Sequence, residues 1–516
     1  MNNKYFFFII SITLFFACNQ VEDNYASLII INANIATMDK DNPSAEAIAV
    51  RDGKIIAIGS NEEIQDYATN NTSEYFDAKG KFLMPGFIEG HGHMGNLGKS
   101  LLKLNLLNTT SWEQIVKMVE KKVKEAKPGE WIEGRGWHQE KWTSTPDKNV
   151  LGYPYHDLIS KISPDNPVIL RHASGHSVFA NKKAMEAAQV SIETPNPKGG
   201  LIVRGDEKEA IGVFEERAMD IVYAAYQEYL DGLDQDKLAA EWLQGIRLAE
   251  DKCLENGITS FQDAGSTFWE IDKYEKLAEE DSLNVRLYVM LRHPYEEMKD
   301  KLEGFPKINK GKDFFTCRAV KSQVDGALGA YGAWLLKSYN DKIGFLGQNT
   351  TTIAEVQNVA DMCFENKMQL CVHAIGDRAN REVLDIFENK IKKYKGSSDE
   401  MRWRIEHAQH VNQADIPRFG QSGIIASMQG IHCTSDSPFV PKRLGHLRSQ
   451  KESYPWRSLI DSGAKIANGT DVPVEDISAI DCFYASVTRK RKDSKNAFFP
   501  EQCMTRQEAL ESYTIN

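Results

Sequence analysis

The fold of this chain is decided in residues 84–93, which read Met84-Pro85-Gly86-Phe87-Ile88-Glu89-Gly90-His91-Gly92-His93. The Pro-Gly pair closes the preceding segment, and a short β-strand follows that carries two histidines at its carboxyl end. Because alternate residues of a strand point to the same face, His91 and His93 can bind one metal ion. Taken alone, the pair fits a structural role equally well, since His-x-His also occurs on protein surfaces.

Three further polar residues stand at the ends of apolar segments later in the chain. His373 ends MQLCVH, His407 ends RWRIEH and Asp471 follows AKIANGT. In a parallel barrel the carboxyl ends of the strands meet at one face, where active sites lie. One such residue fits a buried histidine or a capping aspartate, but three of them together with the histidine pair favour a metal site.

Apolar segments of strand length alternate with helical segments from about residue 257 onward. This alternation predicts βαβ units, and the number of units predicts an α/β fold with a closed, TIM-like (β/α)8 barrel. Thr352 with Glu355, and Thr505 with Glu508, are capping patterns that start two of the helices. The strand candidates cover residues 259–262, 285–290, 317–324, 369–373, 403–407, 424–428 and 465–467.

The segment before the barrel is predicted to be a small all-β unit. Strand-like runs cover residues 28–35, 47–50, 54–58 and 81–84, and Asp52-Gly53 predicts a hairpin turn between the second and third. We therefore assign residues 27–84 to this all-β unit, which the family resemblance described below implies to be the N-terminal part of a β-sandwich, and residues 85–516 to the barrel. An insertion at about residues 95–234, which contains Trp131, Trp137 and Trp142, is expected to form a substrate-selecting subdomain over the barrel mouth.

The first residues differ in character from the rest. Lys4 precedes an apolar run over residues 5–17, shorter than the roughly 20 apolar residues of a membrane span, which fits a secretory signal. The run ends Phe15-Phe16-Ala17-Cys18 and resembles a bacterial lipoprotein signal over 1–17, with a lipid on Cys18 and a polar tether over 18–26. A plain signal peptide is the alternative. We expect an exported lipoprotein, anchored to a membrane in the bacterial periplasm or cell envelope.

Composition excludes one class of partner. The 516 residues are 41% hydrophobic and 26% charged, which is typical of a globular protein. The net charge of −11 argues against a nucleic-acid partner. The cysteines after Cys18 form no CxxC pair and are interpreted as small core residues.

A lysine stands inside one apolar strand candidate, at position 321 of the run RAVKSQVDG. Burial of a lysine is costly unless the amine is paired or neutral, and it lowers the pKa of the amine. A neutral amine can take up CO2 and become a carbamate, an anionic oxygen ligand that is able to bridge two metal ions. The alternative is an ion pair between Lys321 and Asp325.

The chain resembles the amidohydrolase superfamily, and within it the amidohydrolase family 3 branch of N-substituted formamide deformylase-like hydrolases. The resemblance covers nearly everything from Ala26 to Asn516, and its ordered motifs are specific to the family. The matching stretches are MPGFIEGHGH, GRGWHQEKW, SGHSVFANKKAM, NGITSFQDAG, VKSQVDGALG, VHAIGDRAN, RIEHAQH, NGTDVPVE and TRQEALESYTIN.

The resemblance implies a (β/α)8 barrel with a composite β-sandwich built from both ends of the chain. It also implies a metal site of His91, His93, His373, His407 and Asp471, with Lys321 as a carboxylated lysine between the ions. The chain departs from the family at Glu89, where Asp is frequent, at Trp137-His138, where Trp-Asp is frequent, and at Ser174-Gly175-His176, where Asp-Gly-His is frequent.

The last two departures fall in the insertion and leave the substrate open. Trp137, His176 and Asp325 are candidate substrate contacts, with a structural role as the alternative for His176. The C-terminal helix from Thr505 is still apolar at Tyr513 and meets no stop signal, so we expect strands that complete the sandwich to follow Asn516.

We expect hydrolysis of a non-peptide carbon–nitrogen bond, of amide or formamide type, in a small molecule. One or two divalent ions, zinc by preference and Mn, Fe or Co as alternatives, would activate water, and Asp471 would move the proton. One alternative is a mononuclear deaminase of the superfamily, which commonly has a Glu where this chain has Gly376. Another is a lipoprotein that binds a ligand without turnover. A homodimer is left open.

Overall fold

The computed structural model describes residues 25–68, 73–139, 142–173, 177–198, 200–329, 331–394 and 401–516. The chain divides into two compact units, one that ends at Pro85 and one that runs from Gly86 to Asn516. The predicted signal segment with Cys18, and also His176, lie outside the described residues. None of the described helices is long and apolar enough to cross a lipid bilayer.

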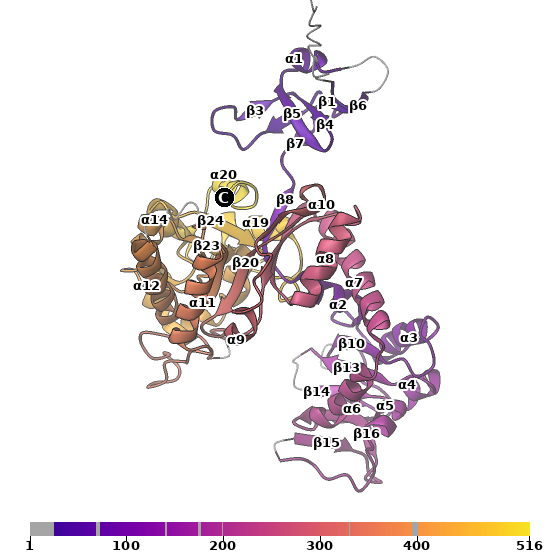
Figure 1. Ribbon diagram of the computed structural model, residues 1–516. Helices are drawn as coiled ribbons and strands as arrows, with labels where there is room; N and C mark the ends of the chain where they lie inside the picture. The colour runs from indigo at the N-terminus through magenta and orange to yellow at the C-terminus, as the bar shows by residue number, and fades with distance from the viewer. Residues whose placement is uncertain are drawn as a thin grey trace, which may run out of the picture. The chain divides into compact units, whose positions relative to one another are not determined.

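The first unit contains two small sheets, ordered β5-β4-β1-β6 and β3-β2-β7 (Figure 1). Asp52 and Gly53 both have positive φ and form the predicted turn between β4 and β5, as a two-residue hairpin loop requires. The strand predicted over residues 28–35 is divided into β1 and β2, because Asn32 takes a left-handed conformation with φ 53°. The elements are β1 Leu28–Ile31, β2 Asn34–Ala36, β3 Ser44–Ala45, β4 Ala47–Arg51, β5 Lys54–Gly59, α1 Asn61–Gln65, β6 Glu74–Asp77 and β7 Phe82–Leu83.

The second unit is built on eight parallel strands in the order β8-β17-β18-β20-β21-β22-β23-β24. Each strand candidate predicted after residue 257 falls on one of them, and the predicted TIM-like barrel is confirmed. The strands are β8 Phe87–Gly92, β17 Ile258–Ser266, β18 Arg286–Leu291, β20 Phe315–Gln323, β21 Gln369–Ala374, β22 Arg404–His407, β23 Ile425–Gln429 and β24 Ile466–Gly469, and β19 Lys307–Asn309 pairs with β20 outside this order.

The barrel closes where β8 meets β24, through contacts that only glycine allows. A Cβ atom on Gly90 would lie 2.4 Å from the carbonyl oxygen of Asn468, and one on Gly469 would lie 2.5 Å from the amide nitrogen of His91. Just beyond β24, the amide of Asp471 donates a hydrogen bond to the His91 carbonyl at 2.7 Å. The glycines of the motifs EGHGH and NGTD therefore let the first and last strands approach each other.

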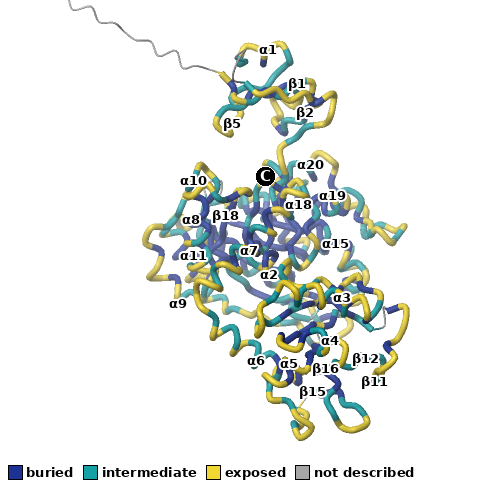
Figure 2. Tube along the Cα trace, turned by 90° about the vertical axis from the view of Figure 1, so that its right-hand side faces the viewer, coloured by how far each residue is buried: buried dark blue, intermediate teal, exposed yellow. Residues whose placement is uncertain are grey.

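Helices cover the outside of the barrel, and its strands are largely buried (Figures 1 and 2). The Thr352 side chain caps α11 by accepting from the Glu355 amide, and Thr505 and Glu508 form a reciprocal capping box on α20, as predicted. The helices are α2 Met94–Leu102, α7 Gln235–Glu255, α8 Phe268–Glu279, α9 Tyr295–Met298, α10 Lys310–Asp313, α11 Ile353–Glu365, α12 Asp377–Tyr394, α14 Ile416–Ser422, α15 Gly430–Asp436, α16 Val440–Leu444, α17 His446–Glu452, α18 Trp456–Asp461, α19 Ala479–Thr488, η2 Pro500–Gln502 and α20 Arg506–Ser512.

The insertion between α2 and α7 forms its own sheet, ordered β15-β16-β14-β13-β10-β9. The two flanking helices cross at Gly98 and Gly245, where a Cβ on Gly98 would lie 2.6 Å from the carbonyl carbon of Gly245. The elements of the insertion are β9 Leu104–Asn105, α3 Trp112–Val123, β10 Ile132–Trp137, β11 Asn149–Val150, β12 Tyr153–Pro154, α4 Asp157–Ile162, β13 Val168–His172, β14 Ser177–Ala180, α5 Lys182–Ala187, β15 Gly200–Arg204, β16 Ala210–Glu216 and α6 Met219–Asp231.

Candidate metal centre

The two histidines of the opening motif lie side by side at the carboxyl end of β8. His91 is fully buried, and the side chain of His93 is 19% exposed. Their ring centroids are 5.6 Å apart. His91 Nε2 lies 3.6 Å and His93 Nε2 lies 3.2 Å from Oδ1 of Asp471, so both rings converge on one carboxylate.

Asp471 follows β24 in a left-handed backbone conformation with φ 60°. Its Oδ1 atom is buried and has no hydrogen-bond partner among the described residues, and its Oδ2 atom lies 3.8 Å from His432 Nε2. Burial alone would raise the pKa of Asp471, but the neighbouring imidazoles of His93 and His91 outweigh burial and lower it. The side chain is therefore a carboxylate that is available as a ligand or a base.

Two more strand-end histidines face this group. The ring of His407, the last residue of β22, has its centroid 4.6 Å from that of His91, and the ring of His373 in β21 lies 4.4 Å from that of His407. His91, His407 and Asp471 can each offer one ligand atom, and these atoms lie within 4.8 Å of one another. The structure thus brings together polar residues from the ends of four strands that are far apart in sequence.

Three histidines of this group, His91, His373 and His407, have lowered pKa values and are neutral. Burial, followed by the positive charge of Lys321, lowers the pKa of His91 to about 4 and that of His373 to about 3. Burial also lowers the pKa of His407 well below its ordinary value. A neutral imidazole keeps the lone pair that a metal ion requires.

Lys321 lies in β20 and is 4% exposed. The hydrogen bond that the structure gives its Nζ atom is to His91 Nε2, at 3.3 Å, so the amine faces the histidine group. Burial lowers the pKa of Lys321 to about 8. A neutral amine is therefore accessible close to physiological pH.

Asp325, which we predicted as a substrate contact, is held by backbone hydrogen bonds beside the histidine group. Its carboxylate is fully buried and accepts backbone N–H bonds from Trp334 at 2.8 Å, Ile375 at 2.9 Å and Gly376 at 2.8 Å. Burial raises the pKa of Asp325 to about 7, against the pull of these hydrogen bonds. Its Oδ1 atom lies 3.7 Å from His373 Nε2. Because the backbone occupies both oxygens, Asp325 positions the loop after β21 beside His373.

Trp137, also predicted as a substrate contact, packs inside the insertion. It is fully buried in the insertion, where its indole N–H donates to the Leu170 carbonyl at 2.7 Å. Its ring lies 6.2 Å from that of Trp142 and 4.7 Å from that of His172.

Sequence reasoning missed two charged residues directly beneath the centre. Glu406 accepts a hydrogen bond from His91 Nδ1, and Arg404 donates to the same carboxylate at 2.6 and 2.8 Å. Both are buried. This carboxylate keeps the His91 proton on Nδ1 and its lone pair on Nε2. The available signal was the motif RIEH, in which two charged residues share a short strand with His407.

His432 was also missed. It follows β23 by three residues, in the segment QGIH, and so completes the pattern of strand-end histidines. Its ring lies 6.2 Å from that of His407. The apolar run 424–428 predicts a strand, and His432 follows it at a distance at which the chain has already entered the next helix.

The donor set fits a divalent metal ion. His373 Nε2 and Asp471 Oδ1 are buried and have no hydrogen-bond partner in the described part of the chain. Such atoms are rare because each is costly, and an ion that accepts their lone pairs would satisfy both. Imidazole nitrogens mixed with carboxylate oxygens suit zinc best.

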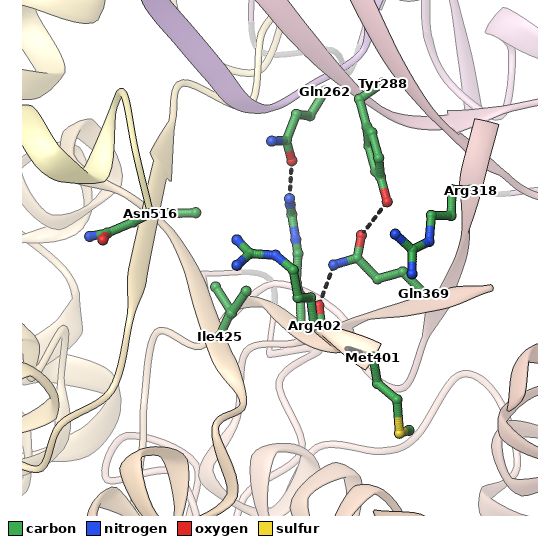
Figure 3. A pocket seen from close by; sticks show the side chains of 10 residues that line it. Gln262, Tyr288, Arg318, Gln369, Met401, Arg402, Ile425 and Asn516 are labelled. Carbon is green, nitrogen blue, oxygen red and sulfur yellow. Dashed lines mark hydrogen bonds between the residues drawn. The ribbon is translucent and has the colours of Figure 1, made fainter. Parts of the chain in front are cut away.

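The hollow at the amino ends of the barrel strands is of another kind. It has a volume of about 200 Å³, and Gln262, Tyr288, Gln369 and Arg404 are among the residues that line it (Figure 3). The Tyr288 hydroxyl donates to Gln369 Oε1 at 2.9 Å, and Arg404 donates to Gln262. None of the described residues that line it has a buried side-chain polar atom without a partner.

Comparison with known proteins agrees with this geometry. The sequence model of the family described as "Amidohydrolase family" matches residues 74–516. Protein LONG AFTER FAR-RED 3 of Arabidopsis thaliana is 30% identical over 502 residues, which cover 95% of this chain and 83% of that protein. N-substituted formamide deformylase of Arthrobacter pascens is 25% identical over 501 residues, with coverage of 95% and 88%. An uncharacterized metal-dependent hydrolase from Pyrococcus horikoshii OT3 has the same fold, with a TM-score of 0.73 and 24% identity over 94% of this chain and 91% of that one.

Proposed function

The chain belongs to the amidohydrolase family, and from this premise we propose that it hydrolyses an amide or formamide bond in a non-peptide small molecule. As a member of the family it is a metal-dependent hydrolase acting on carbon–nitrogen bonds. The proposal rests on the convergence of His91, His407 and Asp471. Two possible ligand atoms at this place, His373 Nε2 and Asp471 Oδ1, have no hydrogen-bond partner among the described residues. The relative from Arthrobacter pascens, which is named for formamide deformylation, supports the choice of bond.

The residues of the centre have three different roles: metal binding, proton transfer and positioning of a ligand. Divalent ions, when bound by His91, His93, His373, His407, Asp471 and Lys321, supply Lewis acidity that polarises the substrate carbonyl and acidifies water. Asp471 takes the proton that the attacking water loses and returns it to the leaving nitrogen. Glu406 holds the His91 ring in place through Nδ1. The products are an amine and a carboxylic acid, or formic acid where the acyl group is formyl.

We propose that Lys321 is carboxylated in the active enzyme. Its amine nitrogen would bond to the carbon of CO2 with loss of a proton, and it lies in the buried histidine group that would hold the ions. Lys321→Ala should lose metal and activity together, and added short-chain carboxylic acids should restore part of both. Full metal content and full rate in Lys321→Ala would rule out this role.

A deaminase that relies on an acid three residues after His373 is disfavoured by the backbone. A Cβ atom on Gly376 would lie 2.1 Å from the carbonyl oxygen of Trp334, so this position accepts no side chain. The Gly376 amide also donates to Asp325. We therefore keep hydrolysis of an amide as the proposed reaction.

Elemental analysis and a substrate screen test the proposal together. Protein purified without chelator should contain at least about one equivalent of divalent metal, as a site of this donor set requires. A library of formamides, acetamides and cyclic amides should contain a substrate whose cleavage stops with chelator and returns with zinc. Protein that stays below about half an equivalent after reconstitution, or that cleaves none of the library, would contradict it.

We also propose that the protein is exported and held at a membrane by a lipid on Cys18. The support is the apolar run over residues 5–17 and the small residue that precedes the cysteine. Cys18→Ala should move the protein from the membrane fraction to the soluble fraction. Unchanged fractionation of this variant would refute the anchor.

A further inference from the structure

His432 is a buried histidine beside the metal centre, and it has no role in the proposed mechanism. Its side chain is 9% exposed and lies at the start of α15. Its Nε2 atom is 3.8 Å from Asp471 Oδ2, too far for a hydrogen bond, and has no hydrogen-bond partner in the described part of the chain. A buried polar atom without a partner is costly, and this one, unlike others in the chain, lies beside the carboxylate of the metal centre, where a bound group could reach it.

A glutamine decides which ring nitrogen of His432 carries the proton. The side-chain nitrogen of Gln409 lies 3.0 Å from His432 Nδ1, and Gln409 is itself buried. Because an amide nitrogen only donates, Nδ1 accepts, and the N–H of the ring is on Nε2. The unpartnered atom is therefore an N–H donor that is directed toward Asp471.

The neighbouring His407 is held in the opposite tautomer by a second glutamine. Its Nδ1 lies 2.8 Å from Gln429 Oε1, and an amide oxygen only accepts, so Nδ1 carries the proton and Nε2 offers a lone pair. The Gln429 side-chain nitrogen donates to the Ser427 carbonyl, which fixes the orientation of this amide. The His407 and His432 rings are only 16° from parallel. The two glutamines thus give the two rings opposite tautomers. His407 Nε2 can act as a metal ligand, and His432 Nε2 can donate a hydrogen bond.

We propose that His432 donates a hydrogen bond from Nε2 to the carbonyl oxygen of the scissile carbon–nitrogen bond. This rests on the proposed function, in which water adds to the carbonyl carbon and the carbonyl electron pair moves to oxygen. A fixed, neutral N–H donor stabilises the oxygen as it gains charge, and the loss of one such donor costs about 10²- to 10³-fold in rate. His432 then serves the oxygen of a neutral acyl group while Asp471 serves the leaving nitrogen.

His432→Phe keeps a ring of similar shape and removes the donor. We expect kcat on the best amide of the screen to fall by about 10²- to 10³-fold, with KM and metal content little changed. Loss of metal in step with activity would make His432 a ligand and overturn the proposal. A rise in KM with unchanged kcat would make it a ground-state contact and would overturn it as well.

His410→Phe is the matched control. His410 is also buried, bonds Ser453 through Nδ1 at 3.0 Å and has an unpartnered Nε2, but it takes no part in the centre. The control should show a similar change in melting temperature, with kcat within about threefold of wild type. Gln409→Met keeps His432 and releases its tautomer, so it should lose about tenfold in kcat. An unchanged rate in Gln409→Met would contradict the assignment of the donor.

Two measurements need no substrate. In protein with ¹⁵N-labelled histidine, the ring signals of His432 should report a proton on Nε2, and a proton on Nδ1 would overturn the proposal. Methylphosphonate, a tetrahedral anion that resembles the hydrated acyl group, should bind the metal-loaded His432→Phe variant about tenfold more weakly than wild type. Equal binding would overturn the proposal. A failed amide screen would overturn the proposed function and leave these two results to decide the role of His432.

Discussion

The two ends of the barrel are built from the same strands but treat polar side chains in opposite ways. At the carboxyl ends, buried atoms of His373, Asp471 and His432 meet without hydrogen-bond partners among the residues that the structure describes. At the amino ends, Tyr288, Gln369 and their neighbours bond one another around an open hollow (Figure 3). The hollow is open, but its polar side chains already bond one another and have little capacity left to bind a ligand. The polar atoms without partners at the carboxyl ends therefore indicate the reactive site.

Arg404 and Glu406 connect the two ends. The Arg404 guanidinium borders the amino-end hollow and donates to Glu406, and Glu406 accepts from His91 at the other end. The chain thus buries an ion pair directly below its metal ligands. We therefore expect substitutions at the carboxyl ends to change the reaction rate. Substitutions of Arg404 or Glu406 should change metal affinity, and substitutions at the amino ends should change only stability.

The largest effect is expected at Asp471. Asp471→Asn should lower kcat by about 10²- to 10⁴-fold, because an amide cannot carry the proton from water to the leaving nitrogen. The variant should stay folded with a somewhat lower melting temperature, because it loses the negative charge that His93 Nε2 approaches at 3.2 Å. Steady-state kinetics and metal analysis on the same preparation check this. A rate within a few-fold of wild type would assign the proton transfer to another group.

A smaller effect is expected in the connection. Glu406→Gln removes the negative charge that orients His91 and supports its basicity, so metal affinity should fall by about 10- to 100-fold. Competition with a chromophoric chelator measures this directly. Because the substitution also leaves Arg404 partly unpaired, a loss of stability of about 3–5 kcal/mol should accompany it.

Asp415→Asn provides the control for that loss of stability. Asp415 is buried and pairs with Arg381 at 2.9 Å and with Arg418 at 3.0 Å, away from the metal centre. It should be destabilised to a comparable degree with metal affinity unchanged. Equal metal loss in both variants would show that Glu406 acts only through the fold.

Much of this arrangement was predictable from the sequence, because it follows from periodicity. Strand candidates identify the barrel strands, and the position of His373, His407 and Asp471 at the ends of apolar runs places them on one face. The Asp52-Gly53 turn and the caps at Thr352 and Thr505 follow from local chemistry. Such features depend on neighbours in the chain.

What could not be predicted depends on neighbours in space. The partner of Glu406 is His91, 315 residues away, and nothing local distinguishes a carboxylate that orients a ligand from one that pairs with an arginine. Asp325 has the position of a substrate contact in sequence, but three backbone amides from distant segments occupy it. The burial of Trp137 likewise depends on how the insertion folds, which local sequence does not show.

A weak effect is expected at the amino-end hollow. Tyr288→Phe removes the hydrogen bond to Gln369 Oε1 and should cost about 0.5–1.5 kcal/mol of unfolding free energy. Because Tyr288 lies at the end of the barrel opposite the metal centre, kcat and metal affinity should stay at wild-type values. Urea unfolding and steady-state kinetics test the two statements. A fall in kcat of more than about threefold would show that this end of the barrel also acts on the reaction.

The weakest effect is expected at the capping box of α20. This helix leads to Asn516, which lines the hollow at the amino ends of the barrel strands. Glu508 accepts from the Thr505 amide at 2.7 Å and from Arg457 at 2.8 Å. The hydrogen bond from Arg457 lowers the pKa of Glu508 to about 2, from an ordinary value of 4.5.

Since the folded state binds this proton less tightly than the unfolded state, the stability contributed by Glu508 is complete above pH 4.5 and is lost as the pH falls toward 2. Glu508→Gln should therefore cost less than about 1 kcal/mol at pH 7, because both side chains of the pair are partly exposed. The difference in urea midpoint between wild type and variant should stay constant from neutral pH down to the ordinary pKa of a glutamate and narrow below it. A difference that widens on acidification would mean that Glu508 is bound more tightly as the acid, and the ion pair with Arg457 would then not be what stabilises this end of the barrel.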